Sequence, residues 1–184
     1  VKIAACAAAL CILAGTVPFA QSATEPGQGP EAVLEYRTIE RAEDPVVVLG
    51  SQIPAYIGFS NANIFVWAHR SGAWQQVVFQ IDESNGYWPY GGTVHKHYQA
   101  DGGLMDADDE ICFMTSDTGD RVDAGTWAPG ANMGVPRMEI TAHDPLTGNK
   151  GWAYLFYHSA PPAWTPVSYV SWNEAANSLT ASNY

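Results

Sequence analysis

The chain has 184 residues, with 19 acidic side chains, 8 basic side chains and a formal net charge of −11 at pH 7. This balance argues against nucleic acid or an anionic membrane as the partner, because both need Lys and Arg to neutralise phosphate. It is compatible with divalent cations, or with a neutral ligand held by aromatic rings. Seven Trp and nine Tyr favour strands and stacking surfaces over helices.

The first 23 residues have the pattern of a secretory signal peptide. Lys2 supplies a minimal positive charge, residues 3–15 are almost all small or apolar, and Pro18 precedes small residues that suit signal peptidase. The apolar run is shorter than the about 20 residues that span a bilayer. We therefore expect a protein that is secreted, periplasmic or at the cell surface, with no membrane attachment after cleavage. Residues 24–31 read as a polar linker.

Cleavage removes Cys6 and Cys11 and leaves Cys112 as the one cysteine of the mature chain. A single cysteine cannot form an internal disulfide, so the domain must rely on its core or on bound ions. Cys112 lies in the apolar run ICFM, and we expect a buried, unreactive thiol there rather than a nucleophile.

Residues 32–184 read as one all-β domain. Short apolar or alternating runs recur at intervals of roughly ten residues between Gly, Pro, Asp and Asn turn signals, as in an antiparallel β-sandwich of the jelly-roll or Ig type. The final residues follow a strand and a turn, so we also expect a further strand in a longer protein. The expected strands are Ala32–Ile39, Val46–Leu49, Ala55–Phe59, Ile64–His69, Trp74–Ile81, Ile111–Thr115, Pro136–His143, Gly151–His158 and Ser168–Trp172.

Two alternations predict which side chains face the core. One face carries Val77, Phe79 and Ile81, and a later strand has Met138, Ile140 and Ala142 on one face, because strand residues alternate between faces. The loop 144–149 predicts an antiparallel hairpin. A second acidic loop, 117–123, contains its own Arg121, which we expect to compensate its charge.

The segment from Trp74 to Arg121 resembles a known class of module. It pairs FQIDE at 79–83 with DADDE at 106–110, followed by the apolar strand ICFM. This combination resembles β-sandwich modules of large secreted bacterial proteins, which accompany polysaccharide lyases and other carbohydrate-active enzymes. The resemblance covers about a quarter of the chain and implies an extracellular β-sandwich in a polysaccharide context. It supplies no catalytic residues.

The acidic turn is the strongest chemical feature of the sequence. Hard oxygen ligands on a Gly-containing loop suit Ca²⁺, which takes six to eight oxygens. The alternative is a solvated turn in which Asp108 or Asp109 caps backbone N–H groups. The candidate calcium ligands are Asp101, Asp106, Asp108, Asp109 and Glu110.

A second candidate is a transition-metal site at His95 and His97. On a strand both rings of an H-x-H pair share one face, and a third ligand from elsewhere completes a common arrangement. The completing ligand could come from Asp101 or from another histidine, with His69, His143 and His158 as candidates. The alternative is two exposed histidines beside Lys96 on a loop.

The third feature is aromatic. A Gly- and Pro-containing segment, YWPYGG, presents Tyr87, Trp88 and Tyr90, and Tyr98 follows. Such a loop displayed on a rigid scaffold is a surface on which sugar rings stack. The alternative is that Trp88 folds back and buries its area over one end of the sandwich. Three further residues, Trp127, Trp152 and Trp164, are expected in the core or against hairpins.

The sequence thus predicts a secreted ligand-binding β-sandwich domain whose partner is an extracellular glycan or another extracellular protein. Aromatic stacking would bind carbohydrate, with calcium ordering the acidic turn. Two alternatives stay open: a metal-dependent, polysaccharide-active enzyme that uses His95 and His97, and a structural subunit whose strand edges pair with neighbouring chains. The sequence contains no G-x-S-x-G, H-E-x-x-H, P-loop or C-x-x-C motif.

Overall fold

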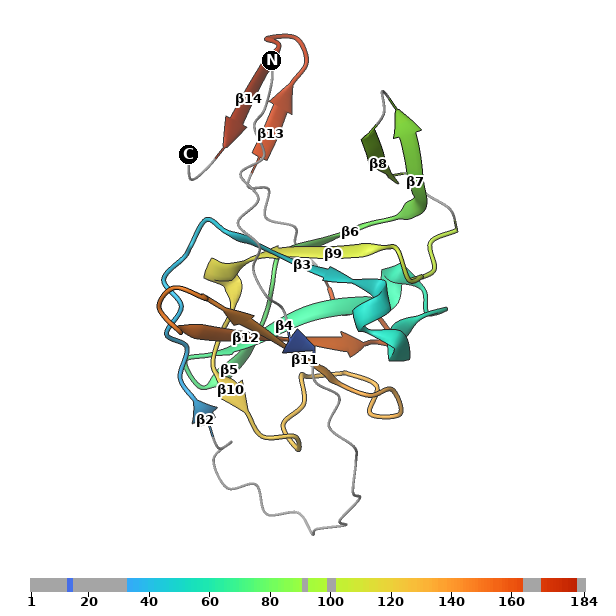
Figure 1. The fold of residues 1–184 in the computed structure, drawn as a ribbon. Coiled ribbons are helices and arrows are strands. Elements are labelled where there is room, and N and C mark those ends of the chain that lie inside the picture. The colour runs from blue at the N-terminus through green and yellow to red at the C-terminus, as the bar shows by residue number, and fades with distance from the viewer. Residues whose placement is uncertain (1–12, 15–32, 91–92, 99–101, 164–169, 182–184) are drawn as a thin grey trace.

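The protein is an antiparallel, all-β fold, seen here in a computed structural model that describes residues 13–14, 33–90, 93–98, 102–163 and 170–181 (Figure 1). Helical structure in these residues consists of the short 3-10 turns η1 Gly50–Gln52, η2 Pro54–Tyr56, η3 Asn61–Asn63 and η4 Thr115–Asp117. The strands are β1 Leu13–Ala14, β2 Val33–Glu35, β3 Pro45–Leu49, β4 Ile64–Arg70, β5 Ala73–Gln76, β6 Phe79–Asp82, β7 Ser84–Tyr90, β8 Thr93–Tyr98, β9 Glu110–Met114, β10 Arg121–Val122, β11 Met138–His143, β12 Lys150–Tyr157, β13 Val170–Asn173 and β14 Ser178–Ala181.

Two antiparallel sheets form the layers of the sandwich. The larger sheet has the order β1-β11-β12-β4-β5, in which β1 lies within the predicted signal peptide, and the smaller has the order β3-β9-β6. The pairs β10–β2, β7–β8 and β13–β14 form separate two-stranded ribbons. Figure 1 shows the three-stranded layer lying over the larger one, with the β7–β8 and β13–β14 ribbons extending beyond the layers.

The main core lies between the two sheets. The inward residues alternate along each strand, as the pleat requires, and they interlock with those of the facing sheet. The smaller sheet contributes Val46, Val48, Ile111 and Phe113, and the larger sheet contributes Ile64, Val66, Ala68, Met138, Ile140, Ala142, Ala153 and Leu155.

A second core covers the opposite face of the larger sheet. There the aromatic side chains of β4 and β12 pack under the segment that includes Val122 and Ala128. Because both faces are covered, residues 64–69 of β4 are all buried, and alternation of exposure disappears. The strand residues of this second core are Phe65, Trp67, Trp152, Tyr154 and Phe156.

Several sequence predictions are confirmed. The strands expected near 46–49, 64–69, 111–115, 136–143 and 151–158 are present within one or two residues at most boundaries. The loop 144–149 joins β11 to β12 as an antiparallel hairpin. Along β11, Met138, Ile140 and Ala142 are buried while the alternate residues are half-exposed.

Other predictions are wrong or incomplete. The expected strand 55–59 is instead η2 and a turn, because Pro54 starts a 3-10 turn. The expected strand 74–81 is interrupted at residues 77–78, and its halves, β5 and β6, belong to different sheets. The strand expected at Ala32–Ile39 is shorter in the structure, where β2 covers Val33–Glu35. The strand expected at Ser168–Trp172 corresponds to β13, and its first two residues lie outside the described residues. The YWPYGG segment was expected as a loop, but Tyr87, Trp88 and Tyr90 lie in β7, which pairs with β8.

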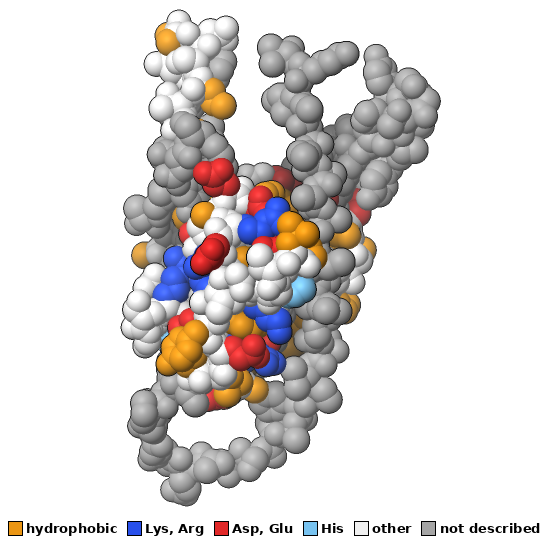
Figure 2. Space-filling model, turned by 60° about the vertical axis from the view of Figure 1, so that its left-hand side comes forward, with side chains coloured by type: hydrophobic (Ala, Val, Ile, Leu, Met, Phe, Trp, Pro, Cys, Tyr) orange, Lys and Arg blue, Asp and Glu red, His pale blue; other side chains and the backbone are white. Residues whose placement is uncertain are grey.

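The surface reflects the mixed charge of the domain. On the face shown in Figure 2, acidic and basic side chains lie beside one another rather than in a large patch of one sign. Among the described residues, the helices are too short to cross a membrane.

Candidate functional site

The acidic turn is held against the 3-10 turns that follow β3. Gly50 N donates to Asp109 O at 2.9 Å, and Ser51 N donates to Ala107 O at 2.9 Å. A Cβ on Gly50 would lie 1.6 Å from the carbonyl oxygen of Asp106, so only glycine allows this close approach. Met105 is buried beneath the turn, and its carbonyl accepts a hydrogen bond from Gly58 N.

Asp109 is the buried centre of the turn, with 0 % of its surface exposed. Its Oδ1 accepts a hydrogen bond from Ser84 N at 3.0 Å, and its Oδ2 accepts one from Asp106 N at 2.9 Å. Asp106 Oδ1 in turn accepts the N–H of Asp108 at 3.0 Å. Backbone capping, the alternative considered for Asp109, is therefore one role that it performs. Asp108 and Glu110 are half-buried, and Asp101 lies outside the described residues.

The aromatic and histidine candidates come together on the β7–β8 ribbon. Trp88 pairs with His95, Tyr87 with Lys96 and Tyr90 with Thr93, while Tyr98 pairs with Ser84 at the base. His95 and His97 are two positions apart on β8, the spacing that an H-x-H site on a strand requires. The structure describes the backbone of these residues. Of the proposed third ligands, His69 and His158 are buried in the aromatic core, and His143 lies on β11.

One grouping was missed by the sequence analysis. Asp82 and Glu110 are directly paired across β6 and β9, and Cys112 is two residues further along β9. One ligand atom of each lies within 4.8 Å of the others. Cys112 is half-buried, so the expectation of a buried thiol is wrong, and its Sγ lies 3.9 Å from Asp82 Oδ2. The alternation of the FQID and EICF strands places these residues on one face, but their register is not visible in the sequence.

A cleft of about 430 Å³ lies over the outer face of β11 and β12. Trp152 forms its apolar floor and is 3 % exposed. Thr141 pairs with Trp152, and His143 pairs with Lys150, so these four positions are adjacent across the two strands. The full lining is Glu35, Arg121, Glu139, Thr141, His143, Lys150 and Trp152.

Arg121 occupies one end of this cleft between two carboxylates. Its Nε donates to Glu139 Oε1 at 2.9 Å, and its Nη1 donates to Glu35 Oε1 at 2.9 Å. Burial acts to lower the pKa of Arg121, but the two carboxylates outweigh it and raise that pKa. The sequence predicted that Arg121 compensates the charge of its own loop. That prediction is wrong, because Arg121 pairs with Glu35 and Glu139 instead. In that loop, Asp117 pairs with Arg70, and Asp120 accepts the backbone N–H of Arg37.

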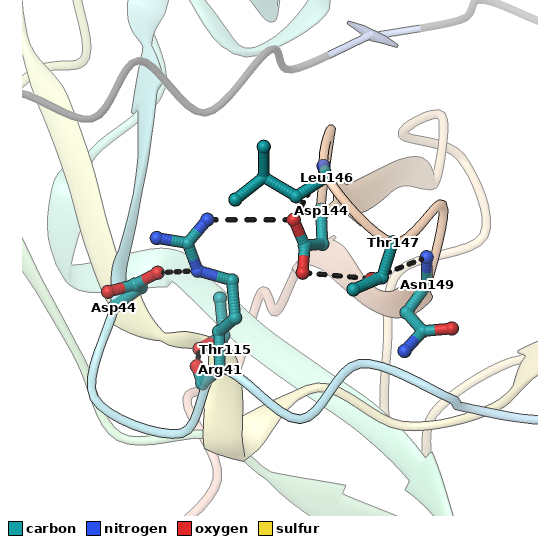
Figure 3. Close-up of polar contacts among 7 residues, drawn as sticks. All are labelled: Arg41, Asp44, Thr115, Asp144, Leu146, Thr147 and Asn149. Atoms are coloured by element: carbon teal, nitrogen blue, oxygen red, sulfur yellow. Dashed lines mark hydrogen bonds and ion pairs between the residues drawn. The ribbon is translucent and has the colours of Figure 1, made fainter.

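The other end of the cleft is fixed by the hairpin loop after β11 (Figure 3). Asp144 Oδ1 accepts the N–H of Leu146 at 2.9 Å, and its Oδ2 accepts the hydroxyl of Thr147 at 2.9 Å. Arg41 lies between Asp44 and Asp144, with its Nη1 3.6 Å from Asp144 Oδ1. The Leu146 bond lowers the pKa of Asp144 most strongly. Burial opposes this effect, and Thr147 and Arg41 add to it.

A buried histidine lies in the aromatic core. Trp67 Nε1 donates to His158 Nε2 at 3.1 Å, and the two rings are stacked. A nitrogen that accepts a hydrogen bond carries no proton, so His158 is neutral with its proton on Nδ1. Burial lowers the pKa of His158, and the Gly130 backbone near Nδ1 opposes this. That contact does not reach full hydrogen-bond geometry, so burial dominates and the pKa of His158 is lowered.

Comparison of the chain with protein-family models, curated proteins and solved structures finds no match.

Proposed function

We propose that this chain is an exported β-sandwich domain that binds an extracellular carbohydrate through its β7–β8 ribbon. The observation that supports this is the placement of three aromatic residues, Tyr87, Trp88 and Tyr90, on a paired strand that extends beyond the sandwich layers (Figure 1). A paired strand holds its residues at fixed spacing, whereas an unpaired loop does not. Fixed spacing favours stacking on a chain of sugar rings, because less conformational entropy is lost on binding.

The base of the ribbon supports the same proposal. Ser84, the first residue of β7, is fully buried and is held by Asp109. The rigid sandwich therefore positions the ribbon, which is the arrangement expected of a binding element carried on a scaffold. Tyr98, at the end of β8, pairs with Ser84 and brings a fourth aromatic residue to the base.

A calcium ion at the outer side of the acidic turn is part of the proposal. Asp106, Asp108 and Glu110 are half-buried within five consecutive residues, and their carboxylates are hard oxygen ligands of the kind Ca²⁺ takes. Asp109 would hold the turn while the carboxylates of Asp106, Asp108 and Glu110 bind the ion. Metal analysis of the purified protein is expected to find calcium near one equivalent. Stoichiometric copper, iron or zinc would instead favour a transition-metal site.

Glycan-array binding of the mature protein tests the carbohydrate proposal. We expect the Trp88→Ala variant to bind at least about tenfold more weakly, since a stacked aromatic ring contributes most of the contact area. The matched control is Tyr36→Ala, which removes an exposed aromatic ring outside the ribbon. Equal binding by the wild type and the Trp88→Ala variant, with equal thermal midpoints, would remove the ribbon from the site.

A further inference from the structure

The cleft over β11 and β12 has an uneven distribution of charge. At one end, the guanidinium of Arg121 is engaged by Glu35 and Glu139, so its charge is already compensated. At the opposite end, His143 and Lys150 are directly opposite each other across the strands. Cross-strand partners have Cβ atoms about 5 Å apart, so the two side chains can reach one ligand group.

Lys150 is the cation of this cleft whose charge is not compensated. Within the part of the chain that the structure describes, its ammonium group is in no ion pair. The carboxylate of Asp144, in the hairpin loop between β11 and β12, is already bound to Leu146, Thr147 and Arg41. Lys150 is therefore a cationic site at the edge of a hollow, on a protein whose net charge of −11 repels anions elsewhere.

The remaining lining suits hydroxyl groups. Thr141 lies between the two ends, and the carboxylates of Glu35 and Glu139 supply hydrogen-bond acceptors beside it. Trp152 is too buried to act as a stacking surface, so recognition at this cleft is polar. The volume of about 430 Å³ falls within the range of small-molecule sites.

We propose that this cleft binds an acidic sugar residue, with its carboxylate at Lys150 and His143 and its hydroxyls at Thr141 and Glu139. The carboxylate is inferred from the charge of the cleft, whereas the choice of a sugar as its carrier rests on the proposed function. The cleft is on the larger sheet and the aromatic ribbon follows the smaller sheet, so the two sites contribute separately to binding.

Hydrogen bonds fix the backbone at the Lys150 end of the cleft. Thr38 holds Lys150 in place, since Lys150 N donates to Thr38 Oγ1 at 3.0 Å and Lys150 O accepts Thr38 N at 2.8 Å. Asp144 N donates to Asn149 O at 2.9 Å and closes the hairpin next to His143. These bonds fix the backbone of Lys150, so only its side chain has to be ordered when it binds an anion.

Isothermal titration of the mature protein with digalacturonate tests this proposal. Galactobiose serves as the neutral counterpart, and succinate as a carboxylate that is not a sugar. We expect digalacturonate to bind more tightly than either, with an affinity that falls as salt rises. The Lys150→Gln variant should bind it at least about tenfold more weakly, because a charge-assisted hydrogen bond is lost. The control is Lys150→Arg, which keeps a positive charge at the same position and should retain most of this affinity.

Three results would overturn the proposal. Equal affinity for digalacturonate and galactobiose would show that the carboxylate is not recognised. Equal affinity for succinate would remove the sugar from the assignment. Unchanged digalacturonate binding by Lys150→Gln, with a loss in Trp88→Ala, would reject the cleft while keeping the ribbon. Conversely, normal digalacturonate binding by Trp88→Ala with a loss in Lys150→Gln would keep the cleft whatever happens to the ribbon.

Discussion

The buried carboxylate of Asp109 accepts the backbone N–H of Ser84 at 3.0 Å, and this bond joins the acidic turn to the first residue of β7. The second oxygen of the same carboxylate holds Asp106 N within the turn. Two sequence features that are 25 residues apart are thus fixed to each other by one side chain. A change in the acidic turn is therefore transmitted to the base of the aromatic ribbon.

Asp109→Asn should destabilise the fold by about 2 kcal/mol or more, because an amide offers one acceptor oxygen where the carboxylate offers two. One of the two backbone N–H groups then faces an NH₂ group in a buried position. Urea unfolding in the presence of EDTA measures this effect without a contribution from calcium.

Asp108→Asn is the matched control for that experiment. Asp108 is half-buried, and no hydrogen bond to its carboxylate is found among the described residues. Its replacement should change the free energy of unfolding by less than about 0.5 kcal/mol under the same conditions. Equal effects of the two substitutions would contradict the role assigned to Asp109.

Tyr56→Phe should cost about 1–2 kcal/mol of stability. The Tyr56 side chain is fully buried, and its hydroxyl oxygen lies 2.8 Å from Leu155 O and 3.0 Å from Pro136 O, so these two carbonyls share its single hydrogen. In the Phe variant the hydroxyl is absent, so a buried backbone carbonyl loses its hydrogen-bond donor. The control is Tyr36→Phe, which is exposed and should leave the urea midpoint unchanged.

The stability of the fold should fall as pH drops below about 6.5, the ordinary pKa of histidine. His158 is kept neutral by burial and by the N–H of Trp67, so its pKa is lower in the folded chain than in the unfolded chain. Between those two pKa values the unfolded chain binds more protons, which favours unfolding. The loss is up to about 1.4 kcal/mol per pH unit.

Urea midpoints between pH 5 and pH 8 measure this dependence. A His158→Phe variant should be less stable at pH 8 but should have a smaller slope below pH 6.5. A His158→Phe variant with the full wild-type slope would show that other groups are responsible.

Asp144→Asn should lower the thermal midpoint at neutral pH, and the difference from wild type should shrink in acid. The folded pKa of Asp144 is lowered, so its stabilising effect is present above the ordinary carboxyl pKa and is lost as pH falls through the folded value. Thermal scans at pH 7 and pH 2.5 measure the two differences. A constant difference at both values would contradict a charge-dependent role.

The alternation of apolar and polar residues correctly predicts the parts of the fold that depend on one sheet face. It predicts the inward face of β11 and the hairpin to β12, because each depends on neighbouring residues alone. It could not predict the break at residues 77–78, because a strand that passes from one sheet to the other keeps its period of two. It also missed β7 and β8, because Gly and Pro near the turn are signals of irregular structure.

The candidate sites depend on contacts that are distant in sequence. Arg121 meets Glu35 across 86 residues, and Asp82 meets Cys112 across 30 residues. Residue types alone indicated that Arg121 compensates its own loop, whereas the β10–β2 register places it at the cleft. The acidic turn itself is visible in the sequence, but its division of roles is not. Asp109 is distinguished by its burial, which requires the fold.

The larger sheet has one core on each face, and the cover of its outer core is built mainly of turns. That cover, from Val122 to Asn132, is held by a few bonds, such as Asn132 N to Tyr157 O at 2.8 Å and Val122 N to the Tyr154 hydroxyl at 2.9 Å. Regions with few ladder bonds open at lower free energy than central strands. The cover is thus a separate opening unit: its amides should exchange with solvent by local opening, while those of β4 and β12 exchange through global unfolding. The inner core can then maintain the fold while aromatic rings of the outer core become briefly accessible.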